Sequence, residues 1–182
     1  MNTVKRSPAF KLAVTALCAA LNITGAFLAL VLRLPIYLDS VGTILNAFIL
    51  GPVFGPLTAL ISSAISYFTS DPFALAFMPG GMLTGLIAGL LFRAGMLSGK
   101  KLPLGTLIAT VPGTIYSACT AAYLFGGNTS SGSSILVQVL SKMGMNLVAA
   151  AFAVQFVTDY ADRLISVAVS TALAKRINKM RF

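Results

Sequence analysis

The chain has 182 residues and a formal net charge of +9; 57% of its residues are hydrophobic and 9% are charged. Soluble domains carry about 25% charged residues, so this composition excludes a water-soluble globular protein and indicates an integral membrane protein. The length suits a single domain, residues 1–182, with about six membrane spans. The apolar stretch after the basic start is long enough to span and has no small-x-small cleavage site, so we expect no cleavable signal.

The positive charge gathers in three clusters, near the two ends and in the middle of the chain. Clusters at span ends are typical of the positive-inside rule and argue against a nucleic-acid-binding surface. The clusters are Lys5, Arg6 and Lys11, then Arg93, Lys100 and Lys101, then Lys175, Arg176, Lys179 and Arg181. The chain has no His, Glu or Trp, and both Cys18 and Cys119 lie in apolar runs. We therefore expect no disulfide, metal site, cofactor or acid–base catalysis.

Seven apolar runs follow one another, at 9–33, 36–50, 53–69, 74–96, 103–125, 134–158 and 160–177. With both basic ends in the cytoplasm, residues 134–177 must add a net single crossing. Either one of the last two runs does not span, or they form one long, broken, tilted helix. We favour a first helix partly at the outer surface or in the bundle interior, followed by a final span. The expected fold is an all-α integral membrane protein, a six-transmembrane-helix bundle with both termini cytoplasmic and a short second helix.

The second run is too short to cross the bilayer alone. As a helix from Ile36 to Leu50 it would rise about 22 Å, whereas the hydrocarbon layer is about 30 Å thick. The topology places the loops 34–38, 70–76 and 126–133 outside and the Pro-rich turn 51–56 inside. The short helix therefore leaves room for a cavity that the outer loops cap, where polar groups are tolerated.

The second run also carries polar residues on one helical face. Asp39, Thr43 and Asn46 are spaced i, i+4 and i+7, and Ser40 borders the same face. In one interpretation Asp39 caps the helix, Thr43 bonds to its own helix and Asn46 joins two helices. In the other, all three line a binding cavity, with Asn46 deepest. Both remain open for Asp39; for Asn46 we favour a pocket or interhelical role over lipid exposure.

Small residues recur at helical spacing in the first and fourth runs. Two pairs four residues apart, Ala9 with Ala13 and Ala16 with Ala20, make a flat stripe on the first helix. The stripe serves either internal packing or the docking of another helix. The fourth run repeats glycine every four residues, at Gly81, Gly85 and Gly89, which predicts close helix packing.

Further candidate site residues flank the outer loops. Tyr67 is either an interfacial belt residue or a ring that stacks on a flat ligand. Asp71 and Phe73 follow it in the second outer loop. Met78, at the outer end of the fourth run, could touch a ligand, although methionine is more often a filler in a core.

The late part of the chain holds the remaining polar candidates. Lys142 either extends to the outer surface or supplies the one cation of the pocket, and Asn146 follows one turn later. Asp159, Asp162 and Arg163 are expected to pair among themselves or with a neighbouring helix. The D-x-x-D spacing of the two acids lacks the further acids and glycines that a metal site of a lipid-headgroup transferase needs.

The whole chain resembles the substrate-binding S components of energy-coupling factor (ECF) transporters, the vitamin-uptake branch of the ABC systems. The matching features are the length, the six spans with both ends inside, the A-x-x-x-A stripe of Ala16 and Ala20, the short span LDSVGTILNAFILGP and the segment DRLISVAVSTALAKRI. The resemblance implies that Ala9, Ala13, Ala16 and Ala20 dock on a membrane-embedded coupling subunit (EcfT-type) and that the outer loops cover a vitamin-sized ligand.

The resemblance further implies that two cytoplasmic ATPases (EcfA-type) drive toppling of the chain in a bacterial cell membrane, which it crosses several times. The chain contains no G-x-x-x-x-G-K-[ST] motif, so we expect it not to hydrolyse ATP and not to be an enzyme. The alternatives are a structural or assembly membrane protein, which predicts no cavity, and a membrane enzyme, which the lack of His and Glu disfavours.

The missing residue types also bear on the expected substrate. The absence of Trp is unlike members that stack thiamine on tryptophan, and the absence of His disfavours metal-ion members. The candidate pocket residues suit a small neutral heteroaromatic such as pyridoxine or hydroxymethylpyrimidine. Pantothenate, an anion, would need Lys142 or Arg33 as a partner, and cobalamin would have to be held by loop contacts. The expected substrate-binding residues are Asp39, Thr43, Asn46, Tyr67, Asp71, Phe73, Met78, Lys142 and Asn146.

Overall fold

The computed structural model describes residues 7–179, which form helices and connecting segments without any strand. The α-helices are α1 (Pro8–Val31), α2 (Val41–Ile49), α3 (Phe54–Thr69), α4 (Ala74–Arg93), α5 (Leu102–Phe125), α6 (Ser134–Lys142) and α7 (Leu147–Lys179), with a 3-10 turn, η1 (Gly99–Lys101), before α5. The basic residues Lys5, Arg6 and Arg181 lie outside the described range. The all-helical class expected from the sequence is confirmed for the residues described.

Local sequence signals explain where the long helices begin and end. The Ser7 hydroxyl accepts the N–H of Phe10, and Pro8 occupies the first turn of α1, a position where its missing N–H costs nothing. The helix ends as Arg33 adopts φ 50°. Gly126, with φ 58°, ends α5 in the left-handed conformation that glycine adopts without strain.

The short helix α2 lies in the middle of the bundle. It contacts α1, α3, α4 and α7, and every residue from Gly42 to Phe48 is buried. Its nine residues rise about 14 Å, so the expected short second helix is confirmed and is shorter still, because residues 36–40 are not helical. A side chain at Gly42 would collide with the carbonyl oxygen of Cys18, which shows how closely α1 and α2 approach.

The division of residues 134–177 differs from the expected one. The first helix ends at Lys142, not near 158, and α7 continues without a break from Leu147 to Lys179. Its 33 residues extend about 50 Å, more than a hydrocarbon layer requires. The polar residues Asp159 and Asp162 do not break α7, because groups on other segments donate hydrogen bonds to their carboxylates.

Glycines in α3 and α4 allow these two helices to touch. A Cβ atom on Gly85 would lie 2.7 Å from Thr43 Cγ2 and 2.9 Å from the carbonyl carbon of Gly55, and one on Gly89 would lie 2.6 Å from Pro52 Cα. These spacings are too short for real side chains, so the predicted close packing is confirmed at Gly85 and Gly89. Gly81 differs, because its Cβ position is an ordinary 3.6 Å from Ala59 Cβ.

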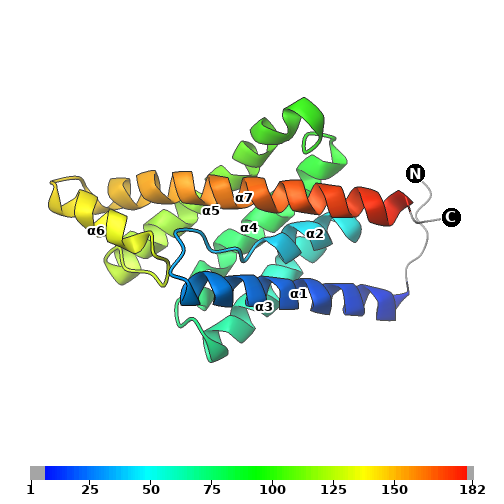
Figure 1. Ribbon diagram of the computed structural model, residues 1–182, viewed down its shortest axis with the longest axis horizontal. Helices are drawn as coiled ribbons and strands as arrows, with labels where there is room; N and C mark the ends of the chain where they lie inside the picture. The colour runs from blue at the N-terminus through cyan, green and yellow to red at the C-terminus, as the bar shows by residue number, and fades with distance from the viewer. Residues whose placement is uncertain (1–6, 180–182) are drawn as a thin grey trace.

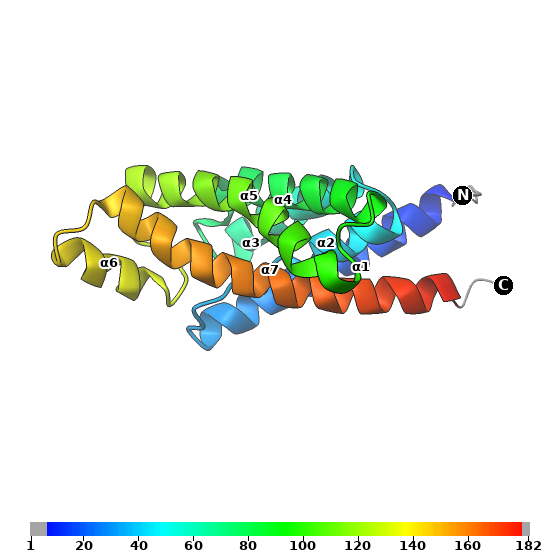
Figure 2. The same ribbon diagram turned by 90° about the horizontal axis from the view of Figure 1, so that it is seen from above.

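Helix lengths and exposed side chains fit a membrane environment. Three described segments are long and apolar enough to cross a bilayer, Pro8–Val31, Ala74–Arg93 and Gly99–Phe125. Large apolar side chains such as Leu12, Leu17 and Phe68 are exposed on the outside of the bundle. The first turn of α1 and the last described turns of α7 lie at one end of the molecule, and α6 lies at the other (Figures 1 and 2). The number of six crossings and the cytoplasmic side stay predictions.

Candidate functional site

A polar cavity of about 80 Å³ lies in the half of the bundle beyond the N-terminus of α2, large enough for several water molecules. Residues from α1, α2, α3, α4, α5 and α7 line it, together with residues of the connections before α2 and α4. Its hydroxyl, amide and charged side chains are Asn22, Tyr37, Asp39, Ser40, Thr43, Ser62, Ser63, Ser66, Asp71, Thr84, Ser117, Gln155, Asp159 and Arg163. Because α2 begins only at Val41, the space beyond its first turn remains open to this cavity.

Asn22 of α1 fixes the first turn of α2 at the cavity wall. Its Oδ1 accepts the backbone N–H of Gly42 at 2.7 Å and of Thr43 at 3.3 Å, while its Nδ2 donates to Thr43 Oγ1 at 2.8 Å and Ser62 Oγ at 3.3 Å. These N–H groups belong to the turn where a helix lacks internal acceptors. Ser40 is the N-cap residue of α2 but makes no capping bond with its side chain. Asn22 therefore caps α2 from another helix.

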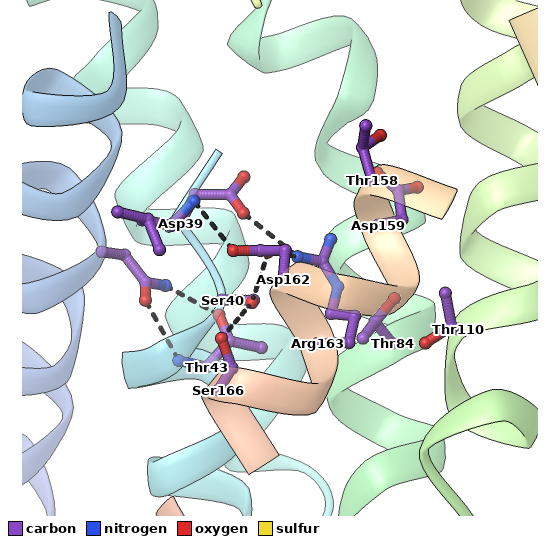
Figure 3. Close-up of polar contacts among 12 residues, drawn as sticks. Asp39, Ser40, Thr43, Thr84, Thr110, Thr158, Asp159, Asp162, Arg163 and Ser166 are labelled. Atoms are coloured by element: carbon purple, nitrogen blue, oxygen red, sulfur yellow. Dashed lines mark hydrogen bonds and ion pairs between the residues drawn. The ribbon is translucent and has the colours of Figure 1, made fainter. Parts of the chain in front are cut away.

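An ion-pair network joins α7 to the connection before α2. Arg163 Nη1 lies 3.4 Å from Asp39 Oδ1 and also pairs with Asp162 Oδ2. Asp162 accepts the N–H of Leu38 at 3.0 Å and the hydroxyl of Ser40 at 3.1 Å, and Figure 3 shows these side chains converging from the two segments. Leu38 has φ 52°, a strained value for a bulky residue, so Asp162 holds a strained backbone in place.

Two further side chains of α7 face the cavity above this network. Asp159 Oδ2 accepts the hydroxyl of Thr114 on α5 at 2.7 Å. Gln155 is 5% exposed, and no described residue donates a hydrogen bond to its Oε1. A buried amide oxygen without a donor is costly, which marks it as an acceptor that a bound molecule could satisfy.

The three connections expected outside the membrane meet over the cavity. Ser130 donates to Asp71 Oδ2 at 2.8 Å, and Gly132 N–H donates to Leu34 O at 3.2 Å. Tyr37, which lines the cavity, is buried, and burial raises the pKa of its phenol well above the usual range. The segment 126–133 thus joins both other connections, and together they form a cover.

Three of the predicted site residues, Asp39, Thr43 and Asp71, line the cavity. Asp39 is not a helix cap, because α2 begins at Val41 and its N-cap is Ser40. Thr43 does not bond to its own helix; its hydroxyl accepts from Asn22. Asp71 has a second role, because its Oδ1 accepts the N–H of Phe73 at 3.0 Å just before α4.

Asn46, expected to be the deepest pocket residue, does not line the cavity. Asn46 is completely buried away from the cavity, and its Nδ2 donates to Thr15 Oγ1 at 3.0 Å on α1 and Thr58 Oγ1 at 2.7 Å on α3. Its position one turn nearer the C-terminal half of α2 places it between three helices. These contacts are the ones that the interhelical alternative for Asn46 predicts.

The other five predicted side chains do not line the cavity. Tyr67 is 40% exposed and meets the edge of Phe68. The ring of Phe73 packs edge to face on the ring of Phe125, with 4.8 Å between the ring centroids. Met78 does not line the cavity, although the preceding residue, Phe77, does. Lys142 and Asn146 are exposed; the Asn146 side chain accepts the N–H of Val148 at the start of α7. Proximity in sequence to the outer connections does not fix the direction in which a side chain points.

The alanine stripe of α1 lies on the outside of the bundle. Ala9, Ala13, Ala16 and Ala20 are all exposed. The buried residues of α1 are Thr15, Cys18, Ala19, Asn22 and Ala29. Internal packing of the bundle therefore does not explain the stripe, and its role in docking stays a prediction.

Several cavity residues were absent from the predicted site. Arg163 and Asp159 are expected from the sequence to form pairs but are not among the predicted site residues, and neither are Asn22, Ser62 and Gln155. Ser62 and Ser66 are one helical turn apart in a membrane helix, which is a weak signal of a polar face. Nothing local distinguishes Asn22, since its partners lie 20 and more residues away.

Comparison with known protein families identifies the family of this chain. The family described as ECF transporter, substrate-specific component, matches residues 10–174. The chain belongs to this family. It matches no curated protein and no solved structure. As an ECF substrate-specific component it is a membrane-embedded transporter subunit and not an enzyme, and its family binds small-molecule substrates and works with EcfT and EcfA modules.

Proposed function

We propose that this ECF component captures a vitamin or vitamin precursor from outside a bacterial cell in the cavity between Asn22, Thr43 and Asp159. It would release the molecule inside after toppling on the coupling subunit, with energy from two partner ATPases. The observation that carries the proposal is a polar cavity inside an apolar bundle, covered by three hydrogen-bonded connections. Polar groups within a membrane protein are costly and usually serve a substrate path.

The exposed alanine stripe supports the proposed docking on an EcfT-type subunit. Small side chains let a second helix approach closely, which is how helices associate in lipid. Ala16 and Ala20 face outward on α1 beside the apolar Leu12 and Leu17. Because the stripe does not line the cavity, docking and substrate binding use different faces of the chain.

Among the substrates considered, size and charge favour the small ones. Pantothenate fits poorly, because Lys142 and Arg33 are exposed and do not line the cavity, while Arg163 is already paired with acids. The cavity of about 80 Å³ has room for a few water molecules and favours a compact ligand over a corrinoid. A small heteroaromatic such as pyridoxine or hydroxymethylpyrimidine remains the proposal.

Native mass spectrometry of the purified full chain tests the capture function. We expect a retained small molecule that disappears in Gly81→Leu, because Gly81 lines the cavity and a leucine there would fill it. The variant Leu12→Ala, on the exposed face of α1, is the control and should keep the molecule. A molecule retained equally by all three proteins would place binding outside the cavity and contradict the proposal.

Uptake measurements with the complete transporter test the docking function. Replacing Ala16 and Ala20 with leucine should abolish uptake and co-purification with the coupling subunit while leaving retention of the small molecule intact. Leu17→Ala, on the same side of α1, should leave uptake unchanged within about twofold. Loss of retention in the alanine variants would contradict separate docking and binding faces.

A further inference from the structure

All four acidic residues of this strongly basic chain gather at the cavity. Asp39, Asp71 and Asp159 line it, and the fourth acid, Asp162, pairs with the same Arg163 Nη1 as Asp39. Of the 13 lysines and arginines, Arg163 is the one among the described residues that lines the cavity. The formal charge at the cavity is therefore negative, opposite in sign to the formal charge of the whole chain.

The single cation of the site is already engaged. Arg163 pairs with both Asp162 and Asp39. Asp71 uses both carboxylate oxygens, for Phe73 N–H and for the Ser130 hydroxyl. Within the described chain, Oδ1 of Asp159 and Oδ2 of Asp39 take part in no hydrogen bond. The cavity thus presents spare carboxylate oxygens and no spare positive group.

Gln155 adds one more hydrogen-bond acceptor to the wall that carries Asp159. Its side chain is 5% exposed, lines the cavity on the face of α7 that carries Asp159 one turn later, and has an Oε1 that lacks a donor among the described residues. Like the spare carboxylate oxygens, this atom needs a hydrogen-bond donor. A ligand with several N–H groups at one end would satisfy these acceptors together.

The remaining lining distinguishes an organic cation from a metal ion. The rings of Tyr37 and Phe77 line the cavity, and aromatic faces attract ammonium groups. The described residues contain no group of three or more His, Cys, Asp or Glu placed to hold a metal ion. The acceptors are therefore spread around a space for a molecule, instead of converging on one point.

We infer that the substrate is a small organic cation whose protonated nitrogen lies between Asp159, Gln155 and Asp39. This inference rests on the proposed capture function and narrows its substrate class. The expected neutral heteroaromatic is replaced by one that carries a charged amine or ring nitrogen. The apolar and hydroxyl-bearing walls, among them Phe77 and Thr84, would surround the uncharged part.

Three probes of one shape and different charge test the inference on the purified full chain. We would measure the thermal unfolding midpoint with benzylamine, which is protonated at neutral pH, with neutral benzyl alcohol and with anionic benzoate. Benzylamine should raise the midpoint most and benzoate least. A rise with benzoate that equals or exceeds the rise with benzylamine overturns the inference, and so does equal or absent stabilisation by all three.

Charge variants locate the effect in the cavity. Asp159→Asn keeps the shape and an acceptor for Thr114 but removes one carboxylate, and should weaken benzylamine affinity at least about tenfold. Ser98→Lys changes the net charge by the same amount at an exposed position outside the cavity and should leave this affinity unchanged. Equal losses in both variants, or none in Asp159→Asn, overturn the inference.

The failure of this inference can be distinguished from failure of the proposed function. If native mass spectrometry finds a neutral or anionic molecule that Gly81→Leu loses, capture in the cavity stands and the cationic class is wrong. If benzylamine stabilises the chain equally with and without Gly81→Leu, the bound cation lies outside the cavity and the inference fails as well.

Discussion

Asn22 on α1 holds the backbone N–H of Gly42 on α2 at 2.7 Å, so the helix at the centre of the bundle is capped by a side chain 20 residues earlier. The close approach is possible because Gly42 has no side chain to meet Cys18. The side-chain amide of Asn22 also donates a hydrogen bond to the Ser62 hydroxyl on α3. One asparagine therefore ties three helices together at the floor of the cavity.

Asn22→Ala should lower the free energy of unfolding by about 2 to 4 kcal/mol, because it leaves buried N–H and hydroxyl groups without partners. Asn146→Ala is the matched control, since Asn146 also caps a helix but is exposed, and should cost about 1 kcal/mol or less. Thermal or denaturant unfolding in detergent measures both. Equal losses of unfolding free energy in the two variants would contradict a stabilising cap supplied by Asn22.

Arg163→Gln should destabilise the chain by about 3 to 5 kcal/mol, because Asp162, which is 1% exposed, would lose its cation. Adding Asp162→Asn removes the uncompensated charge, so the double variant should be more stable than the sum of the two single losses predicts. A double-mutant cycle of unfolding free energies measures this coupling. Strictly additive losses would contradict the ion-pair network.

Gly85→Ala should destabilise the bundle by about 1 to 3 kcal/mol, because the new methyl group would meet Thr43 and the backbone of Gly55. Gly81→Ala, one turn earlier on the same helix, meets Ala59 at an ordinary distance and should change stability by less than about 0.5 kcal/mol. Unfolding midpoints compare the two. A larger effect at Gly81 would be inconsistent with the helix contact described.

Ser130→Ala should loosen the cover over the cavity, because it removes the hydrogen bond to Asp71. Amide hydrogen exchange in residues 126–133 should become about tenfold faster, the size expected for a bond to a charged group. Exchange in residues 70–76 should also become faster, because Ser130 bonds Asp71 of this connection. In the control, Ser134→Ala, the lost hydroxyl bonds to Thr129 O and Ser131 O, so exchange in residues 70–76 should not change. Unaltered exchange in Ser130→Ala would show that other bonds hold the cover.

The properties that depend on composition and local spacing could be predicted before the fold was known. The apolar content and the basic clusters indicated a membrane protein, and five of the seven apolar runs correspond to helices within a few residues, with the shortness of α2 already visible. The close packing at Gly85 and Gly89 was also predictable, since glycine at a four-residue repeat leaves one helix face flat. The division between α6 and α7 was not, because acids at 159 and 162 seemed to mark a helix end.

Which polar residues line the cavity depends on contacts between segments far apart in the chain. Asn46 and Thr43 share a helical face in the sequence, yet one lies between helices and the other lines the cavity, because α1, α3 and α4 surround α2 differently along its length. Arg163 meets Asp39 across 124 positions of sequence. No local pattern contains such a contact; it exists because folding brings α7 beside the start of α2, where a buried charge must find its partner.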